Sequence, residues 1–163
     1  MARFLAFLLA LLLAATPLRA ERFQALVLRV KDGDSLVVER LPQKRVSEIR
    51  LAGIDAPELG QPWGPSARAA LRRLVQGREV TVVVVDRDRY GRLVGKLWVG
   101  GTYVNAAMTR SGNAWAVRQY GADAEVRAGH AAARREGRGL WALPPEQRIP
   151  PATWRATNPR GAR

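Results

Sequence analysis

The sequence predicts a small α+β domain, mainly β, built on a five-stranded barrel. Three observations lead to this fold class. Five runs rich in β-branched and aliphatic residues lie between residues 23 and 99. One segment with helical periodicity interrupts them after the third run, and two more follow the fifth. The chain has 163 residues, which is enough for one domain with a substantial core and too few for two of that size.

The first three strand-like runs cover residues 23–30, 35–41 and 46–54. Lys-Asp-Gly-Asp at 31–34 separates the first two, and Asp-Gly between apolar runs is a strong hairpin signal. Taken alone, such an acidic turn is more often solvated than functional. We therefore expect a hairpin turn, with its second acid, Asp34, at the start of the following strand.

The helical segment after the third run covers residues 64–77. Pro65 stands at a first helical position, Ala and Leu fill the middle, and Gly77 follows the end, as is typical of a helix. The remaining expected elements are strands at 79–86 and 91–99 and helices at 103–112 and 124–139.

Five short strands with a helix inserted after the third favour a small closed barrel. The five-stranded Greek-key barrel of the OB fold, with about three helices packed against it, is the simplest arrangement that fits. An SH3-like barrel and a general α+β sandwich stay open on the pattern alone. One face of an OB barrel commonly binds oligonucleotides.

The two ends of the chain differ from the domain at 21–142. Residues 1–20 have a positive start, an apolar run of about twelve residues and a small residue, Ala20, before a cleavage point, which is the pattern of a signal peptide. The run is short for a membrane span, and an uncleaved N-terminal anchor is the alternative. Residues 143–163 are Pro-rich and basic without apolar periodicity, so we expect this tail to be disordered or draped over the surface.

The amino-acid composition favours some partners and excludes several kinds of site. The chain carries 27 Lys and Arg against 14 Asp and Glu, a formal net charge of +13, which favours nucleic acid, anionic lipid or another acidic polymer as partner. The absence of Cys excludes disulfides, thiolate catalysis and Cys-ligated zinc. The single histidine, His130, excludes a histidine-rich metal site, and since no acidic partner stands near it in the sequence, we interpret it as structural.

Acidic and basic residues gather at three predicted strand ends, at 32–34, 50–58 and 88–92. Cleavage of a phosphodiester needs a cation to screen the anionic substrate, a base to take a proton from water, and donors for the charge that builds on the phosphoryl oxygens. Carboxylates such as Asp34 and Asp55 suit Ca²⁺ or Mg²⁺, and arginine forks match two phosphate oxygens. The three segments together contain a residue for each role.

The segment around Asp55 needs a bend if it is to act with Arg50. Pro57 favours an extended chain, so Asp55 and Glu58 can lie up to about 10 Å apart, and Glu58 could act as a general base on a water beside the metal. Arg50 and Asp55 are an odd number of residues apart, which on a flat strand puts them on opposite faces. Gly53 lies between them and permits a bulge or bend, which we take as a hypothesis.

The third segment offers a second arginine. Gly91 can adopt the positive φ of a tight connection, which leaves Arg92 at the start of the returning strand. Alternation then places Arg92 on the opposite face from Leu93 and Leu97. Arg92 can therefore overlook a site at this end of the strands.

In their order and spacing, these segments resemble the staphylococcal-nuclease-like (thermonuclease) family. The resemblance extends from about Val27 to Trp141 and rests on the stretches VKDGDSL, IRLAGIDAPE, WGPSARAAL, DRYGRLVGKLWV, YVNAAMTRSGNAWA and GLWA. It leaves out the signal peptide and the tail. It implies an OB barrel and a Ca²⁺-dependent nuclease that cleaves DNA and RNA internally and from the ends, with little sequence preference, to products with 3′-phosphates.

The resemblance also implies roles for individual residues. Carboxylate ligands of Ca²⁺ are implied at Asp34 and Asp55, a carbonyl ligand at Ala56, where Thr is frequent in the family, and a supporting role for Asp32. A general base is implied at Glu58, and contacts to the scissile phosphate at Arg50 and Arg92. Contacts to a neighbouring phosphate are implied at Arg89 and Tyr90. Nucleotide binding is implied at Tyr120 and at Arg118, which stands in place of a family tyrosine.

Together these inferences predict an exported Ca²⁺-dependent phosphodiesterase with DNA and RNA as substrates. We expect a monomer in the periplasm or outside the cell, without stable membrane insertion after signal cleavage. The main alternative is a noncatalytic OB-type nucleic-acid-binding module of the same superfamily, and an envelope-associated basic protein is a third. Binding alone has no use for the carboxylates of Asp34, Asp55 and Glu58, because without a metal they repel phosphate. The carboxylates therefore favour the enzyme.

Overall fold

A computed structural model describes residues 21–158 of the chain. The predicted signal peptide at 1–20 lies outside the described residues, as do residues 159–163 of the tail. No helix between residues 21 and 158 is both long enough and apolar enough to cross a bilayer. The long strands are β1 (Arg22–Val30), β2 (Ser35–Arg40), β3 (Arg45–Leu51), β5 (Glu79–Arg87) and β6 (Leu93–Val99).

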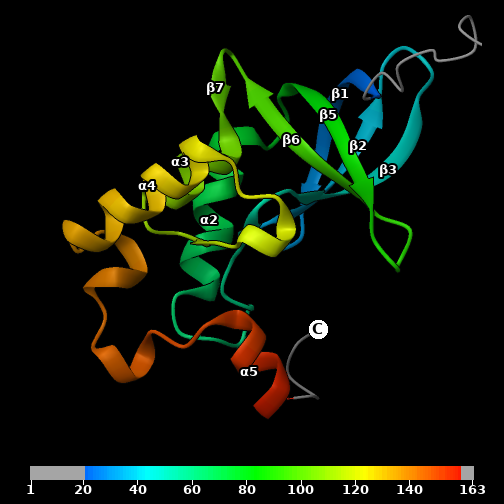
Figure 1. The fold of residues 1–163 in the computed structure, drawn as a ribbon. Helices are drawn as coiled ribbons and strands as arrows, with labels where there is room; N and C mark the ends of the chain where they lie inside the picture. The colour runs from blue at the N-terminus through cyan, green and yellow to red at the C-terminus, as the bar shows by residue number, and fades with distance from the viewer. Residues whose placement is uncertain (1–20, 159–163) are drawn as a thin grey trace, which may run out of the picture.

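These five strands close into a barrel (Figure 1). They are hydrogen-bonded in the order β3-β2-β1-β5-β6, and all neighbours in this order are antiparallel. A parallel pairing of β3 with β6, in which Arg50 lies opposite Val94, joins the two ends of the order. The predicted fold class, an α+β domain on a five-stranded OB-type barrel, is therefore confirmed.

Helices pack beside the barrel at all three predicted positions, and a fourth helix was not expected. The predicted ones are α2 (Gly64–Val75), α3 (Val104–Arg110) and α4 (Ala124–Arg135), and the unexpected one is α5 (Pro151–Thr157). The shorter elements are β4 (Ile54–Asp55), β7 (Thr102–Tyr103), β8 (Trp115–Ala116) and 3₁₀ helices at Arg118–Tyr120, Gly139–Ala142 and Pro145–Gln147.

The tail is ordered as far as residue 158, so of the two expectations for it, disorder does not apply to the part that the structure describes. Pro151 is buried and begins α5, where its missing N–H costs nothing. Before the helix, the Arg148 Nε donates to the Leu143 carbonyl at 2.6 Å. Figure 1 shows α5, in red, beside the loop that leads into α2. Prolines restrict the unfolded chain, so fewer apolar contacts are needed to order such a segment.

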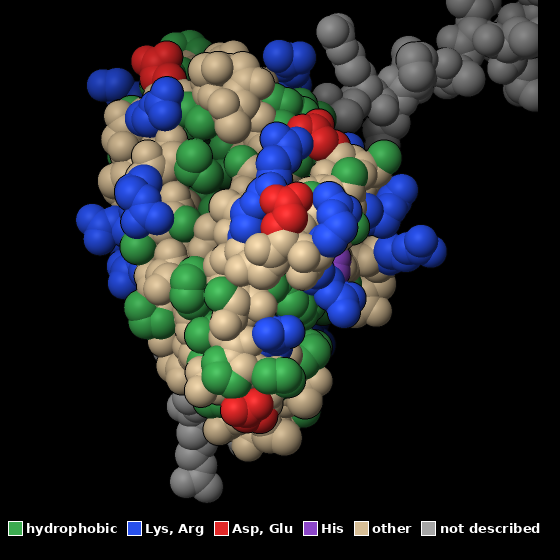
Figure 2. Space-filling view, turned by 90° about the vertical axis from the view of Figure 1, so that its left-hand side faces the viewer, with side chains coloured by type: hydrophobic (Ala, Val, Ile, Leu, Met, Phe, Trp, Pro, Cys, Tyr) green, Lys and Arg blue, Asp and Glu red, His purple; other side chains and the backbone are tan. Residues whose placement is uncertain are grey.

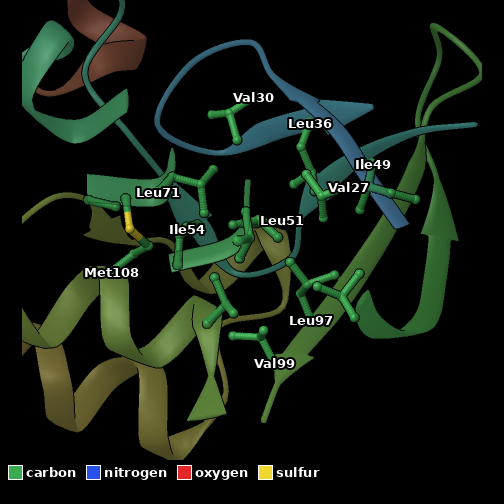
Figure 3. Packing of buried hydrophobic residues seen from close by; sticks show 14 of the residues in the cluster. Val27, Val30, Leu36, Ile49, Leu51, Ile54, Leu71, Leu97, Val99 and Met108 are labelled. Atoms are coloured by element: carbon green, nitrogen blue, oxygen red, sulfur yellow. The ribbon is translucent and has the colours of Figure 1, made fainter. Parts of the chain in front are cut away.

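The core fills the barrel and continues under the helices (Figure 3). Leu36, Ile49 and Leu97 come from three different strands and are fully buried. Leu71 of α2 and Met108 of α3 are fully buried on the helical side of the same cluster. On β6 the predicted alternation is confirmed, with Leu93, Leu97 and Val99 buried and Lys96 partly exposed between them.

A buried polar side chain, Asn105 of α3, ties this helix to the barrel and to the turn that follows β3. Its Oδ1 accepts a hydrogen bond from the Leu97 N–H at 3.0 Å. Its Nδ2 donates to the Ala52 carbonyl at 2.9 Å and to the Gly95 carbonyl at 3.2 Å. Because Asn105 has no exposed surface, water cannot take over these contacts without a structural change.

We predict that Asn105→Ala lowers the free energy of unfolding by about 2–4 kcal/mol, since it leaves the buried N–H of Leu97 and carbonyl of Ala52 without their side-chain partner. Urea unfolding measures the change. Gln119→Ala, at an exposed position, is the control and should change stability by no more than about 0.5 kcal/mol. A loss for Asn105→Ala as small as that of the control contradicts the prediction.

Candidate active site

Asp34 ends the connection between β1 and β2 and is buried, with 4% of its surface exposed. Its Oδ2 accepts from the Ala56 N–H at 2.6 Å, and its Oδ1 accepts from the Ser35 hydroxyl at 3.1 Å. The Asp32 side chain accepts from the Asp34 N–H at 3.0 Å and so braces the connection from within. The hairpin therefore turns the Asp34 carboxylate inward, toward Ala56.

The glycine of this connection is needed for a reason that the sequence pattern did not indicate. Gly33 lacks the positive φ that a tight Asp-Gly turn would use. A Cβ atom at Gly33 would lie 2.6 Å from the Ala56 Cβ and 2.8 Å from the Ala67 Cβ. The connection thus packs directly against residue 56 and α2, and this close packing helps to fix the position of Asp34.

Arg50 and Asp55 meet because the chain bends between them. β3 ends at Leu51, and Gly53 follows with a φ of 75°. Arg50 Nη2 then donates to the Asp55 Oδ1 at 2.8 Å and to the Ile54 carbonyl at 3.3 Å. The bend that the sequence suggested at Gly53 is present, and it turns Asp55 back toward β3.

The Arg50 guanidinium bridges the two buried aspartates. Its Nη2 binds Asp55, and its Nη1 forms an ion pair with the Asp34 Oδ1. Asp55 is only 2% exposed, and Asp34 is nearly as buried. Burial of either carboxylate without a positive partner would carry a large desolvation cost. The structure has therefore brought Asp34, Arg50 and Asp55 together around one charge.

This donor set fits a hard divalent cation. Two buried carboxylates converge on one cationic group, and the backbone of Ala56 is bound to one of them. Carboxylate and carbonyl oxygens, completed by water, are the ligands that Ca²⁺ and Mg²⁺ prefer. Within residues 21–158 there is no cluster of three or more His, Cys, Asp or Glu arranged to hold a metal. A cation at Asp34 and Asp55 would therefore depend on the backbone and on water for its other ligands.

Glu58 lies in the loop before α2, bound to a residue that the sequence analysis did not single out. Arg155 of α5 donates from Nη1 to the Glu58 Oε1 at 2.7 Å. The same guanidinium donates to the Asp55 Oδ1 at 3.2 Å and Oδ2 at 3.0 Å. Partial burial alone would lower the pKa of Arg155, but its bonds to the Asp55 and Glu58 carboxylates raise that pKa above the usual range.

Gln61 is a second residue that the sequence analysis missed. It is 2% exposed, and its Oε1 accepts from the Glu58 N–H at 3.1 Å. Its Nε2 donates to the Ile149 carbonyl, so it links the Glu58 loop to the tail. A signal for an ordered tail was present in the sequence, because Pro150-Pro151 ahead of Trp154-Arg155 is a helix start followed by an aromatic residue.

Arg92 faces the same side as Arg50 but binds other partners. The parallel pairing sets Arg50 opposite Val94, two residues after Arg92, so both arginines point the same way. The Arg92 Nε donates to the Asp88 Oδ2 at 2.7 Å, and its Nη1 lies 3.9 Å from the Glu48 Oε1. Partial burial would raise the pKa of Asp88, but hydrogen bonds from Arg92 and the loop backbone hold that pKa below its usual range.

The other predicted site residues lie on more exposed segments. Tyr90 is 68% exposed in the β5–β6 connection, and the Arg89 Nη2 donates to its hydroxyl at 2.8 Å. Arg118 and Tyr120 lie in a 3₁₀ helix, where the Tyr120 carbonyl accepts from the Gly53 N–H at 2.5 Å. That contact places the 118–120 segment against the bend between β3 and β4.

His130 has the packing role that the sequence analysis gave it. Its ring meets Trp141 edge-on, with the ring centroids 5.1 Å apart. Burial and the nearby charge of Arg134 hold the pKa of His130 below its ordinary value, so the imidazole is neutral at pH 7.

The matching family model and the three relatives described next are all named as nucleases. The family model described as staphylococcal nuclease homologue matches residues 48–143. A protein of Escherichia coli O157:H7 named an uncharacterized endonuclease is 36% identical over 148 residues, which cover 90% of this chain and 94% of that protein. A micrococcal nuclease of Shigella flexneri is 39% identical over 155 residues, covering 88% of this chain and 86% of that protein. A staphylococcal-like nuclease of Arabidopsis thaliana is 39% identical over 113 residues, which cover 69% of this chain and 34% of that protein.

We predict that Gly33→Ala lowers the free energy of unfolding by about 1–3 kcal/mol, because the new methyl group would overlap the side chains of Ala56 and Ala67. Thermal or urea unfolding in the absence of any metal measures the loss.

The double variant Gly33→Ala with Ala56→Gly separates the overlap from other effects, since it removes one of the two opposing methyl groups. It should regain part of the lost stability. If Gly33→Ala is as stable as the parent chain, the close packing does not constrain this connection.

Proposed function

Because this chain belongs to the family of staphylococcal nuclease homologues, we propose that it is a Ca²⁺-dependent nuclease that hydrolyses the phosphodiester bonds of both DNA and RNA and leaves 3′-phosphates. The observation that carries the proposal is the meeting of two buried aspartates with Arg50, on the barrel face that Arg92 also joins. Glu58 is held near them, because Arg155 binds both Glu58 and Asp55. These groups match the needs of phosphodiester hydrolysis.

Asp34 and Asp55, with the Ala56 carbonyl, would hold the cation. Bound there, Ca²⁺ would supply positive charge that neutralises the phosphate. Arg50 and Arg92 would donate forked hydrogen bonds to the phosphoryl oxygens, on which negative charge builds during attack.

Glu58 would accept the proton of the attacking water. The bond between phosphorus and the 5′-oxygen would break, so that the phosphate stays on the 3′ side, and the leaving 5′-oxygen would take a proton from water. Arg89 and Tyr90 would contact a neighbouring phosphate, with Arg118 and Tyr120 near the adjoining nucleotide.

The charge of the molecule supports a polyanionic substrate. The chain carries a formal net charge of +13, and Figure 2 shows a face on which Lys and Arg far outnumber acidic side chains. Such a surface attracts nucleic acid in a salt-dependent way. The groups of the proposed site all lie within one chain, so the monomer that we propose could carry out the reaction by itself.

A noncatalytic nucleic-acid-binding module is the second candidate. The basic surface alone would be enough for such a module to bind nucleic acid. The buried carboxylates would hinder binding, because they repel an approaching phosphate unless a cation neutralises them. We also propose export, which rests on the signal-peptide pattern of residues 1–20.

We predict Ca²⁺-dependent cleavage of single- and double-stranded DNA and of RNA by the purified protein, with a loss of roughly 10²-fold or more when a chelator removes the metal. Parallel reactions with Mg²⁺ test the choice of cation. Products should resist extension by a polymerase until a phosphatase removes the 3′-phosphate. Absence of any metal-dependent cleavage would contradict the proposal and favour the binding module.

Glu58→Gln is the matched variant for this assay, because it keeps the shape of the side chain and removes the base. It should keep nucleic-acid binding, measured by fluorescence anisotropy, and lose about 10²–10⁴-fold in turnover. Unchanged turnover would remove Glu58 from the proposed role.

We predict that the full chain, expressed in a bacterial host with two membranes, leaves the cytoplasm and begins near Glu21 when its N-terminus is sequenced. Leu9→Arg interrupts the apolar run and should keep the chain uncleaved in the cytoplasm. A parent chain that remains membrane-bound at full mass would support the uncleaved anchor instead.

A further inference from the structure

Arg155 brings a second positive group to the acidic residues of the candidate active site from the far end of the chain. Its guanidinium makes three hydrogen bonds. Two go to the oxygens of Asp55, which is 100 residues away in the sequence, and one goes to Glu58, which is 97 residues away. About a third of its side chain is exposed, against 3% for Asp55. Arg155 itself lies outside the segment that the family model matches, which ends at residue 143.

The tail that carries Arg155 is anchored on the same loop as Glu58. Gln61 accepts from the Glu58 N–H and donates to the Ile149 carbonyl, so the loop and the tail share one buried amide. Pro150 and Pro151 then start α5 directly after this anchor. The short helix thus delivers Arg155 to the carboxylates from a fixed point on the loop.

We propose that α5 is an autoinhibitory segment in which the Arg155 guanidinium takes the place of the metal ion, so that docking of α5 and binding of the cation exclude each other. The inference rests on the proposed metal site at Asp34 and Asp55.

The hydrogen bonds at the two aspartates support this exclusion. The Asp34 oxygens accept from Ser35, Arg50 and the Ala56 N–H. The Asp55 oxygens accept from Arg50 and Arg155. All four carboxylate oxygens are therefore already bonded, and two arginine charges balance the two aspartates.

A divalent cation would have to replace one of these arginines. Arg50 comes from the middle of the barrel wall, since it pairs with Ser35 on one side and Val94 on the other. Arg155 comes from a seven-residue helix of which Pro151 is the buried residue. Release of α5 would expose Pro151 and the partly buried Trp154 of one short helix, whereas Arg50 belongs to a strand that is paired on both sides. Arg155 is therefore the arginine that can be displaced.

The docked position of Arg155 also opposes the proposed reaction. It occupies one of the two Glu58 oxygens that could accept a proton from water. It lies on the same Asp55 oxygens that a cation would use, where two positive groups repel each other. A role for Arg155 in assisting catalysis from this position is therefore disfavoured.

The test compares the purified full chain with Arg155→Gln in Ca²⁺ titrations followed by calorimetry. Arg155→Gln should bind Ca²⁺ on the order of tenfold more tightly, because no docked arginine has to be displaced. Arg155→Lys keeps the charge but loses the fork that spans two residues, so it should fall between the two. Arg73→Gln, at an exposed position on α2, removes the same charge as a control and should match the parent chain.

Hydrogen exchange of the amides in 151–157 gives a readout independent of activity. In the parent chain, saturating Ca²⁺ should speed this exchange by releasing α5. In Arg155→Gln the exchange should be fast with or without Ca²⁺. Cleavage by Arg155→Gln should exceed that of the parent chain at low Ca²⁺ and equal it at saturation.

Equal Ca²⁺ affinity of the parent chain and Arg155→Gln would overturn the proposal, as would exchange in α5 that Ca²⁺ leaves unchanged. Slower cleavage by Arg155→Gln at saturating Ca²⁺ would overturn it in favour of an assisting role. If neither protein binds Ca²⁺ while Arg155→Gln still speeds exchange in 151–157, the docking contact is real but the proposed metal site fails, and the exclusion fails with it.

Discussion

The candidate site depends on one interaction, the bridge that Arg50 forms between Asp34 and Asp55. Either carboxylate would be costly to bury alone, and both are nearly inaccessible to water. The bridge is possible because Ser35 pairs with Arg50 across β2 and β3, which places the preceding residue, Asp34, beside the guanidinium. The register of one hairpin thereby decides whether the two acids can share a charge.

The rest of the fold holds the ends of this bridge in place. Asn105 fixes the turn after β3 by binding the Ala52 carbonyl, and the segment at 117–120 binds both backbone groups of Gly53. Closure of the barrel through the parallel β3–β6 pairing adds Arg92 on the same face. These contacts come from different parts of the chain, so the geometry of the site is a property of the closed barrel.

The charges of the site constrain its chemistry. Arg50 and Arg155 together balance the carboxylates of Asp34 and Asp55, while Arg155 also binds Glu58. A divalent cation added to this arrangement would leave an excess of positive charge, which a phosphate group could offset if an arginine turned toward it. Without a metal, Arg50 and Arg155 both balance the aspartates, whereas with a metal only Arg50 would remain beside them. The tail matters here because Arg155 is the one delivered by a short peripheral helix.

The sequence by itself determined the elements of the barrel and the groups at their ends. Alternation on β6, the helix begun at Pro65, the bend at Gly53 and the acids at 32–34 all have local signatures, because backbone geometry repeats every two or about 3.6 residues. Only the tertiary structure decided that Gly33 is needed for its contact with Ala56 and Ala67, not for its φ. It alone also decided that Arg155 reaches Asp55 across 100 residues. Such contacts depend on where distant segments meet after the barrel has closed, and no pattern within either segment records the identity of its partner.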